Sequence, residues 1–161
     1  MSDRHNIHAT GIVIGRTGII LRGPSGAGKS LLALALLDEW IGSGRTARLV
    51  ADDRLEITVE KGRAVMHAPR NIEGMAELRG RGIVSRPSVA KAPVHLLVDL
   101  VPELVRMIEE EELETDLLGV ALPRCPVPRA GVVDMGHQLL LIREALRELS
   151  TTKASPRQNS A

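Results

Sequence analysis

Aromatic side chains are almost absent from this chain of 161 residues, which holds one Trp and neither Tyr nor Phe. The hydrophobic core must therefore be built from Leu, Ile, Val, Ala and Met. Proteins that bind single-stranded nucleic acid commonly stack its bases on aromatic side chains. The composition excludes almost every site of that kind, and it argues against an aromatic sandwich for an adenine ring.

Cysteine pairs, long apolar runs and an excess of charge are missing as well. The single cysteine, Cys125, cannot form an internal disulfide, which is typical of a reducing cytoplasm. No apolar run approaches the length of a membrane span, and residues 1–6 lack the apolar segment of a signal peptide. The formal net charge is +1, so no strong field draws nucleic acid or anionic lipid. We therefore expect a cytoplasmic protein with neither a membrane nor a nucleic acid as partner.

The length and composition predict one globular domain. A hydrophobic content of 43% and a charged content of 25% are ordinary for a soluble protein of this size. No internal repeat is evident. We expect the folded domain to span residues 1–149 and the polar residues 150–161 to form a disordered tail.

One segment matches the phosphate-binding pattern G-x-x-x-x-G-K-[ST] at every fixed position. An apolar stretch that predicts a strand precedes it, and a run of good helix formers follows it. In such a loop the backbone N–H groups and the helix N-terminus bind phosphate. The lysine would contact the β- and γ-phosphates, and the serine hydroxyl would bind Mg²⁺. The residues are Gly23, Pro24, Ser25, Gly26, Ala27, Gly28, Lys29 and Ser30.

The remaining pattern predicts an α/β fold around this loop. A strand pair before the loop has the pattern of a hairpin, with a turn at residues 15–18. No clean period appears over residues 69–93, which are expected to form a loop, and a polar loop with an acidic helix is expected over 101–112. Prolines crowd a rigid segment at 123–128. Strands are predicted at 7–14, 19–21, 47–51, 55–59, 63–67 and 94–100, and helices at 30–41 and 138–149.

Two carboxylates follow the strand predicted at residues 47–51. Asp52 and Asp53 lie at the carboxyl end of that strand, where ligands bind in open α/β sheets. One could act on the metal and the other as a base. Adjacent residues of a strand point to opposite faces, so both reach the site only if the strand has ended before them. A polar turn is the alternative, but the neighbouring phosphate loop favours a functional pair.

The segment from Ala76 to Ser85 carries a carboxylate, two arginines and two glycines. Glu77 could complete the oxygen ligands of a Mg²⁺ ion. Arg79 could offset charge on a transferring phosphoryl group. Taken without a family comparison, a solvated, glycine-containing loop is the slightly better interpretation of this segment.

Histidine and the remaining arginines give weaker indications. His8 lies in the first predicted strand, and a lone histidine is more often a packed or surface residue than a catalytic one. The other histidines show no metal-ligand spacing with one another or with Cys125, so no zinc site is predicted. Arg106 carries no indication by pattern alone.

Three blocks of this sequence resemble the catalytic domain of HPr kinase/phosphorylase. Residues 7–11, Ile-His-Ala-Thr-Gly, resemble the family's histidine-containing strand before the phosphate loop. The phosphate loop and the later Val-Ala-Asp-Asp at 50–53 resemble its nucleotide site. Residues 77–84 resemble its motif E-I-R-G-x-G-I-I. The family phosphorylates a serine of HPr, the phosphocarrier of the bacterial sugar phosphotransferase system.

The resemblance implies a role for each matching residue. Asp53 would be the base for the HPr serine and would return a proton in the reverse reaction. His8 and Lys29 would be active-site residues, Ser30 and Glu77 would bind Mg²⁺, and Arg106 would match a catalytic arginine. ATP and Mg²⁺ are the implied cofactors, a hexamer is the implied assembly, and a mixed central sheet with flanking helices, as in phosphoenolpyruvate carboxykinase, is the implied fold.

The sequence also departs from this family. Many members carry a further amino-terminal domain, and alphaproteobacterial members resemble the short form seen here. The family's P-V-R-P-G-R-type loop, which is tied to phosphorylase activity, is here Pro-Val-Pro-Arg-Ala-Gly at residues 126–131. Ser85 replaces the usual Asn after the family motif. The altered loop at residues 126–131 favours the kinase activity over phosphorolysis of phosphoserine-HPr.

Two alternatives remain open from the sequence. A small-molecule P-loop kinase would share the phosphate loop but does not predict the Asp52–Asp53 pair or the motif at Glu77. A non-catalytic regulator that binds ATP and signals to a sensor kinase or to phosphotransferase components would fit the short chain and the altered loop. Neither the allosteric effectors nor the choice between ATP and pyrophosphate as donor follows from the sequence.

Overall fold

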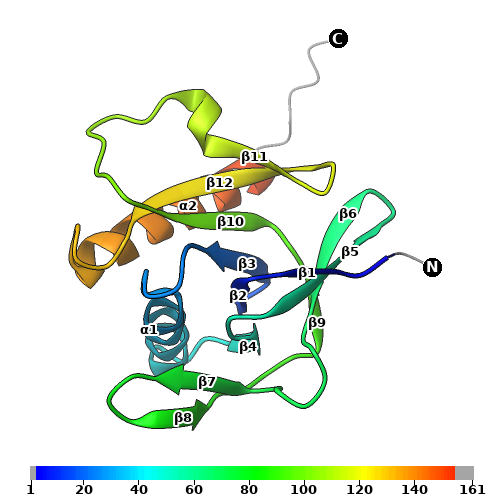
Figure 1. Cartoon of the computed structure of the whole chain (residues 1–161). Coiled ribbons are helices and arrows are strands. Elements are labelled where there is room, and N and C mark those ends of the chain that lie inside the picture. The colour runs from blue at the N-terminus through cyan, green and yellow to red at the C-terminus, as the bar shows by residue number, and fades with distance from the viewer. Residues whose placement is uncertain (1–2, 155–161) are drawn as a thin grey trace.

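The computed structural model describes residues 3–154, and Figure 1 shows a mixed α/β domain. Two α-helices are present in that part of the chain, α1 at Lys29–Gly42 and α2 at Met135–Ala154. A short 3₁₀ helix, η1, covers Glu110–Leu113. The strands are β1 His5–Ile7, β2 Ala9–Ile14, β3 Thr17–Arg22, β4 Ala47–Ala51, β5 Leu55–Glu60, β6 Arg63–His67, β7 Met75–Leu78, β8 Gly82–Ser85, β9 Lys91–Pro93, β10 Leu96–Val101, β11 Glu114–Leu117 and β12 Val120–Pro128.

A six-stranded mixed sheet forms the centre, in the order β11-β12-β10-β3-β2-β4. Strand β10 runs parallel to β3 on one side and to β12 on the other. Strands β2 and β3 pair antiparallel through the turn at residues 15–16, which confirms the predicted hairpin before the phosphate loop. The sheet therefore presents the carboxyl ends of β3, β10 and β12 at one edge, where the loops after these strands meet.

The central sheet is covered differently on its two faces. Both helices pack on one face, where Ile19, Leu21 and Val98 join α1 and α2 in one core. A second sheet, in the order β1-β5-β6-β9, covers the other face and shares a core with Ile20 and Leu97. Figure 1 shows the helices and this second sheet on opposite sides of β10 and β3. The prediction of a mixed central sheet is confirmed, but the helices do not flank both faces, because a sheet occupies one of them.

The two sheets approach closely at β2. A Cβ atom at Gly11 would lie 2.8 Å from side-chain atoms of both Leu55 and Met66, so a larger residue there would displace these side chains. The chain passes from the second sheet to the central one at His8, which separates β1 from β2. His8 therefore lies at a bend and not within a continuous strand over 7–14, as the sequence predicted.

The region 69–93 has more regular structure than the sequence indicated. Strands β7 and β8 form a two-stranded hairpin, and β9 joins the second sheet. In the turn of the β7–β8 hairpin, Gly80 and Gly82 have φ values of 94° and 112°, which favour glycine. These strands have only three or four residues each, too few to give a periodic pattern.

Three further expectations needed correction. The acidic run forms only the 3₁₀ helix η1, because the chain enters strand β11 directly after it at Glu114. The proline-rich segment is strand β12. Pro126 and Pro128 lie beyond the residues paired with β11, so no described neighbour on that side requires an N–H donor at these positions. Helix α2 continues to Ala154, past the predicted boundary at 149, and the rest of the expected tail, 155–161, lies outside the described residues.

Helix α2 begins beside β12. The Asp134 carboxylate accepts the backbone N–H of His137 at 2.9 Å and so caps the helix start. Gln138, which is buried, donates from its side chain to the carbonyl of Pro128 at 2.9 Å. Within residues 3–154, no helix is both long enough and apolar enough to cross a bilayer.

Candidate active site

The phosphate loop connects β3 to α1 as the sequence predicted. Gly26 and Gly28 have φ values of 83° and 96°, a left-handed conformation that favours glycine. Gly28 is the residue before the helix, and no side chain caps the helix there. The first N–H groups of a helix have no partner within it. The start of α1 is therefore suited to bind an anion.

Lys29 lies folded against the loop that contains it. Its side chain is 5% exposed. The Nζ atom donates to the carbonyl of Gly23 at 2.7 Å and to that of Pro24 at 3.3 Å. It also lies 3.4 Å from Nε2 of His8. The ammonium group is thus held at the mouth of the loop, where the sequence predicted a phosphate contact.

Asp53 faces the same mouth from the end of β4. Its Oδ1 atom lies 3.1 Å from Nε2 of His8 and 3.9 Å from Nζ of Lys29. Its side chain is 57% exposed, so a substrate can reach the carboxylate. Three of the residues predicted to be catalytic therefore converge, although they come from three separate parts of the chain.

Asp52 holds the neighbouring elements together. Its Oδ1 atom accepts hydrogen bonds from the hydroxyls of Ser30 at 2.7 Å and Thr10 at 3.0 Å. Its Oδ2 atom accepts the backbone N–H of Glu77 at 3.2 Å. Strand β4 ends at Ala51, so the two aspartates are not bound to opposite faces of the sheet. Both side chains could reach the site only if the strand ended before them, and this condition is met.

The β7–β8 hairpin brings Glu77 to this corner. The guanidinium of Arg86 binds both carboxylate oxygens of Asp38 on α1, at 2.7 and 2.9 Å, and so anchors the hairpin to that helix. Hydrogen bonding to Asp38 is the main cause that raises the pKa of Arg86. The hairpin is thus fixed in its first strand by Asp52 and just after its second strand by helix α1.

The donor atoms at this corner fit a magnesium ion. Mg²⁺ prefers oxygen ligands and usually combines one or two protein groups with waters and substrate phosphates. The Ser30 hydroxyl and the Asp52 carboxylate supply such oxygens beside the phosphate loop, and the backbone of Glu77 lies against Asp52. Among residues 3–154, no cluster of three His, Cys, Asp or Glu forms a metal site by itself.

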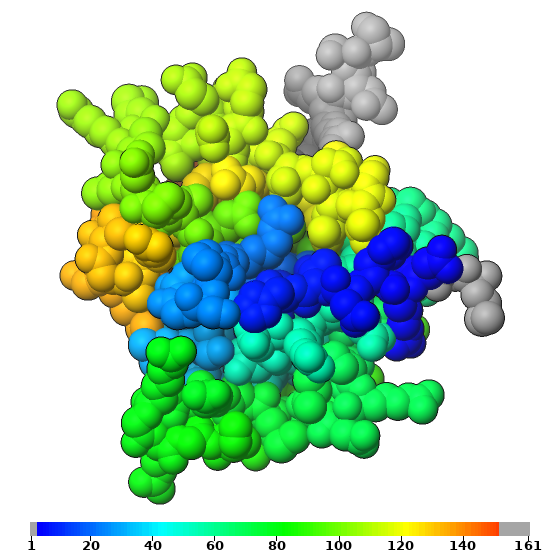
Figure 2. Space-filling view, in the orientation of Figure 1, coloured from blue at the N-terminus to red at the C-terminus, as the bar shows by residue number. Residues whose placement is uncertain are grey.

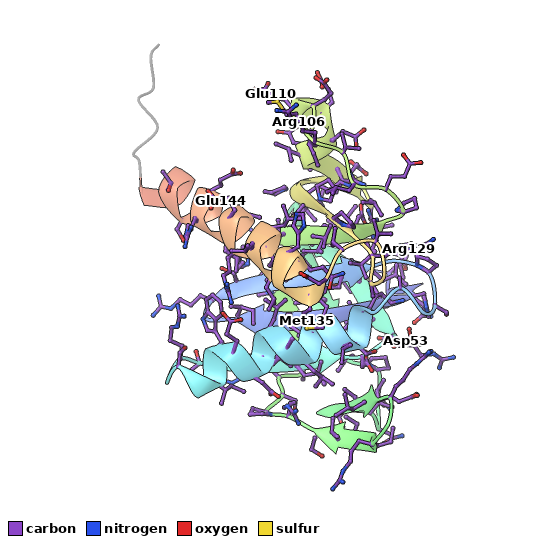
Figure 3. The ribbon with its side chains drawn as sticks, turned by 90° about the vertical axis from the view of Figure 1, so that its left-hand side faces the viewer. Asp53, Arg106, Glu110, Arg129, Met135 and Glu144 are labelled. Carbon is purple, nitrogen blue, oxygen red and sulfur yellow. The ribbon has the colours of Figure 1, made fainter. Side chains whose placement is uncertain are left out.

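Arg106 does not lie in this cluster. It belongs to the exposed segment 102–109, which lines a groove of about 770 Å³ together with residues of β12 and α2. Figure 3 shows Arg106 beside Glu110 at the upper end of the molecule, well separated from Asp53. Its assignment as a catalytic residue stays a prediction.

The chain returns to the phosphate loop after β12. The N–H of Ala130 donates to the carbonyl of Ala27 at 3.3 Å. A Cβ atom at Gly28 would lie 3.1 Å from that of Ala130. Neither Ala130 nor Thr10 was singled out by sequence analysis, because an alanine carries no chemical pattern and a single threonine in an apolar strand is common. Both became visible only as contacts.

Comparisons with known proteins assign this chain to a family. The model of the HPr Serine kinase C-terminal domain matches residues 1–154. The chain belongs to this family. The expected resemblance is therefore confirmed over nearly the whole sequence.

Named relatives and a solved structure support the same assignment. An HPr kinase/phosphorylase of Geobacillus thermodenitrificans is 32% identical over 150 residues, which are 86% of this chain and 45% of that protein. One of Clostridium tetani is 27% identical over 156 residues, 90% of this chain and 48% of that protein. The structure described as the Hpr(Ser) kinase/phosphatase from Coxiella burnetii matches with a TM-score of 0.73 and 26% identity, over 94% of this chain and 99% of that one. This chain spans about half the length of the curated relatives it matches.

Proposed function

We propose that this chain is an ATP-dependent protein serine kinase whose substrate is HPr. The observation that carries the proposal is the convergence of Asp53, His8 and Lys29 at the mouth of the phosphate loop, within 3.1 to 3.9 Å of one another. A carboxylate beside a phosphate site can serve a hydroxyl nucleophile. Membership in the HPr Serine kinase C-terminal domain family supplies the class of substrate.

In the proposed reaction, Asp53 accepts the proton of the HPr serine hydroxyl. The serine oxygen forms a bond to the γ-phosphorus of ATP while the bond to the β-phosphate oxygen breaks, which leaves ADP and phosphoserine. His8 holds the Asp53 carboxylate at 3.1 Å. The loop backbone and Lys29 bind the phosphates and align them with the serine.

Ser30, Glu77 and Asp52 are the residues that would hold magnesium. When bound, the ion supplies positive charge to the phosphate oxygens as the charge of the transferring group develops. Asp52 keeps the Ser30 hydroxyl turned toward this corner through the hydrogen bond of 2.7 Å.

The surface around the loop suits a protein substrate. Figure 2 shows the phosphate-loop region (blue) between two projections, a yellow-green one above and a green one below. The lower projection includes the β7–β8 hairpin, whose exposed arginines are Arg79 and Arg81. We propose that HPr docks between these projections, so that its serine reaches Asp53.

The test is to incubate the protein with Mg²⁺, ATP labelled at the γ-phosphate and either HPr or an HPr variant whose regulatory serine is alanine. Label on HPr but not on the variant supports the kinase. Label on neither, with the nucleotide still bound, would favour the regulator. Label on a sugar or nucleoside in place of HPr would favour the small-molecule kinase.

A reverse activity has one structural observation in its favour. The segment after β12 contacts the phosphate loop through Ala130 and Ala27, despite its altered sequence. In phosphorolysis, inorganic phosphate would attack the phosphoserine phosphorus, and the serine oxygen would leave with a proton from Asp53 to give pyrophosphate. Release of labelled pyrophosphate from phosphoserine-HPr and orthophosphate would test this.

A further inference from the structure

Thr10 places a hydroxyl inside an otherwise apolar part of the central sheet. Its side chain is 0% exposed, and its neighbours in β2 are Ala9 and Gly11. A buried hydroxyl is costly unless it forms hydrogen bonds. The two hydrogen bonds of Thr10 both go to the aspartate pair that follows β4.

One bond fixes a side chain and the other fixes the backbone. The Thr10 hydroxyl donates to Oδ1 of Asp52 at 3.0 Å. The backbone N–H of Asp53 donates to the same hydroxyl oxygen at 3.1 Å. A threonine hydroxyl has one proton and two lone pairs, so it can form both bonds at once.

The conformation of Asp53 explains why such a restraint matters. Its φ of 66° is left-handed, which is uncommon for residues other than glycine. Such conformations persist where the surroundings hold them. The bond from the Asp53 amide to Thr10 is a restraint of this kind, and it acts on the residue whose carboxylate lies beside His8 and Lys29.

We propose that Thr10 is a positioning residue for phosphoryl transfer, an inference that rests on the proposed function. Through the Asp53 amide it sets the direction of the carboxylate that receives the serine proton. Through Asp52 it sets the direction of the Ser30 hydroxyl. Thr10 itself touches neither the nucleotide nor the protein substrate, because β2 buries it completely.

Three variants separate this role from ordinary packing. Thr10→Val keeps the shape and removes the hydroxyl, while Thr10→Ser keeps the hydroxyl. Thr58→Val is the matched control, because Thr58 is also buried and bonds through its hydroxyl to Glu60 and His67 in the second sheet. If Thr10→Val does not fold, Thr10→Ala replaces it, with the circular dichroism and melting temperature of each variant as the check.

The first measurement is hydrogen exchange at the Asp53 amide by NMR, which needs no substrate. We expect exchange to be about tenfold faster or more in Thr10→Val, because the amide loses its acceptor, and unchanged in Thr58→Val. Unchanged exchange in Thr10→Val would overturn the inference.

The second measurement is the kinetics of HPr phosphorylation. We expect kcat to fall by about 10- to 100-fold in Thr10→Val, with the affinity for Mg²⁺-ATP within about threefold of the wild type. Thr10→Ser should restore most of kcat, and Thr58→Val should not lower it. Equal losses in both valine variants would assign the effect to packing and overturn the positioning role. If the wild type phosphorylates no HPr, the proposed function fails, and the exchange experiment still decides whether Thr10 holds Asp53.

Discussion

Two aspartates flank the phosphate loop, and their surroundings differ in almost every respect. Asp53 is 57% exposed and lies 3.1 Å from His8. Asp99, on β10, is 16% exposed and binds the guanidinium of Arg22 through both oxygens, at 2.8 and 3.0 Å. It also accepts from Nε of Arg124 at 2.6 Å. The hydrogen-bonding capacity of Asp99 is therefore committed to the fold, whereas Asp53 remains accessible to a substrate.

The Asp99 network shows how the fold holds the loop in place. Burial by itself would raise the pKa of Asp99, but hydrogen bonds and charge from Arg22 and Arg124 outweigh it and hold the pKa below the ordinary 3.8. Arg22 immediately precedes Gly23, and Arg124 also binds Glu112 of η1 at 3.0 Å. The buried carboxylate thus fixes the start of the phosphate loop and the end of the segment 102–113. The comparison teaches that pairing and exposure separate a structural carboxylate from a chemical one.

The sharpest test of the comparison is Asp53→Asn. We expect the rate of transfer to HPr to fall by about 10³-fold, because an amide cannot accept the serine proton. Binding of Mg²⁺-ATP, measured by titration calorimetry, should change little. Asp3→Asn, at an exposed position near the amino end, is the control. Loss of nucleotide binding in equal measure would contradict the role of Asp53 as the base.

Lys29→Ala should have the next largest effect, and on a different quantity. The ammonium would form charge-assisted hydrogen bonds to phosphate, so we expect nucleotide affinity to weaken by about 10- to 100-fold together with the transfer rate. Titration of the variant with Mg²⁺-ATP measures this. An unchanged dissociation constant would show that Lys29 does not contact the phosphates.

Asp99→Asn should act on stability more than on chemistry. We expect the free energy of unfolding to fall by about 2 kcal/mol, below the range for a fully buried pair because Arg22 is a third exposed. The matched control is Asp38→Asn, which breaks the more exposed pair with Arg86 and should cost less than about 1 kcal/mol. Urea denaturation measures both.

The loss of stability in Asp99→Asn should depend on pH in a definite direction. A carboxylate whose folded pKa lies below its unfolded value stabilises the fold above the unfolded pKa, and that stability is lost as the pH falls through the folded pKa. The difference in free energy of unfolding between the wild type and Asp99→Asn should therefore be complete at neutral pH. It should shrink below about pH 4, since the ordinary pKa of an aspartate is 3.8. A difference that grows on acidification would contradict the pairing.

Cys125 is the position at which we expect the smallest effect on activity. The reactivity of its thiol tests how well water is excluded from the core around it. Burial raises the pKa of the Cys125 thiol from 9.0 to about 12. Alkylation by iodoacetamide at pH 9 should be at least about 100-fold slower in the folded than in the urea-unfolded protein, because only the thiolate reacts. Because the pKa of the thiol is higher in the folded protein than in the unfolded one, its contribution to the free energy of unfolding is complete below the unfolded pKa. That contribution is lost as the pH rises toward about 12. Rapid labelling of the folded protein would contradict the burial.

Much of the site could be predicted from the sequence because its elements are local. The phosphate loop, the hairpin before it and the end of β4 at the aspartate pair each depend on a few consecutive residues. The short strands β7 and β8 could not be predicted, because each is stabilised by its partner and not by its own pattern. Strand β12 was hidden by prolines that only its place in the sheet makes acceptable.

The sequence by itself determined the phosphate loop and the chemical types of the catalytic candidates, because glycine conformations and side-chain chemistry belong to the residues themselves. Only the tertiary structure decided which carboxylate remains accessible. Asp53 and Asp99 carry the same group, and they differ because Asp99 lies beside Arg22 and Arg124 in the packed sheet, whereas Asp53 follows the end of a strand. The tertiary structure also made Thr10 the partner of the aspartate pair, because pairing of β2 with β4 brings residues more than forty positions apart into contact.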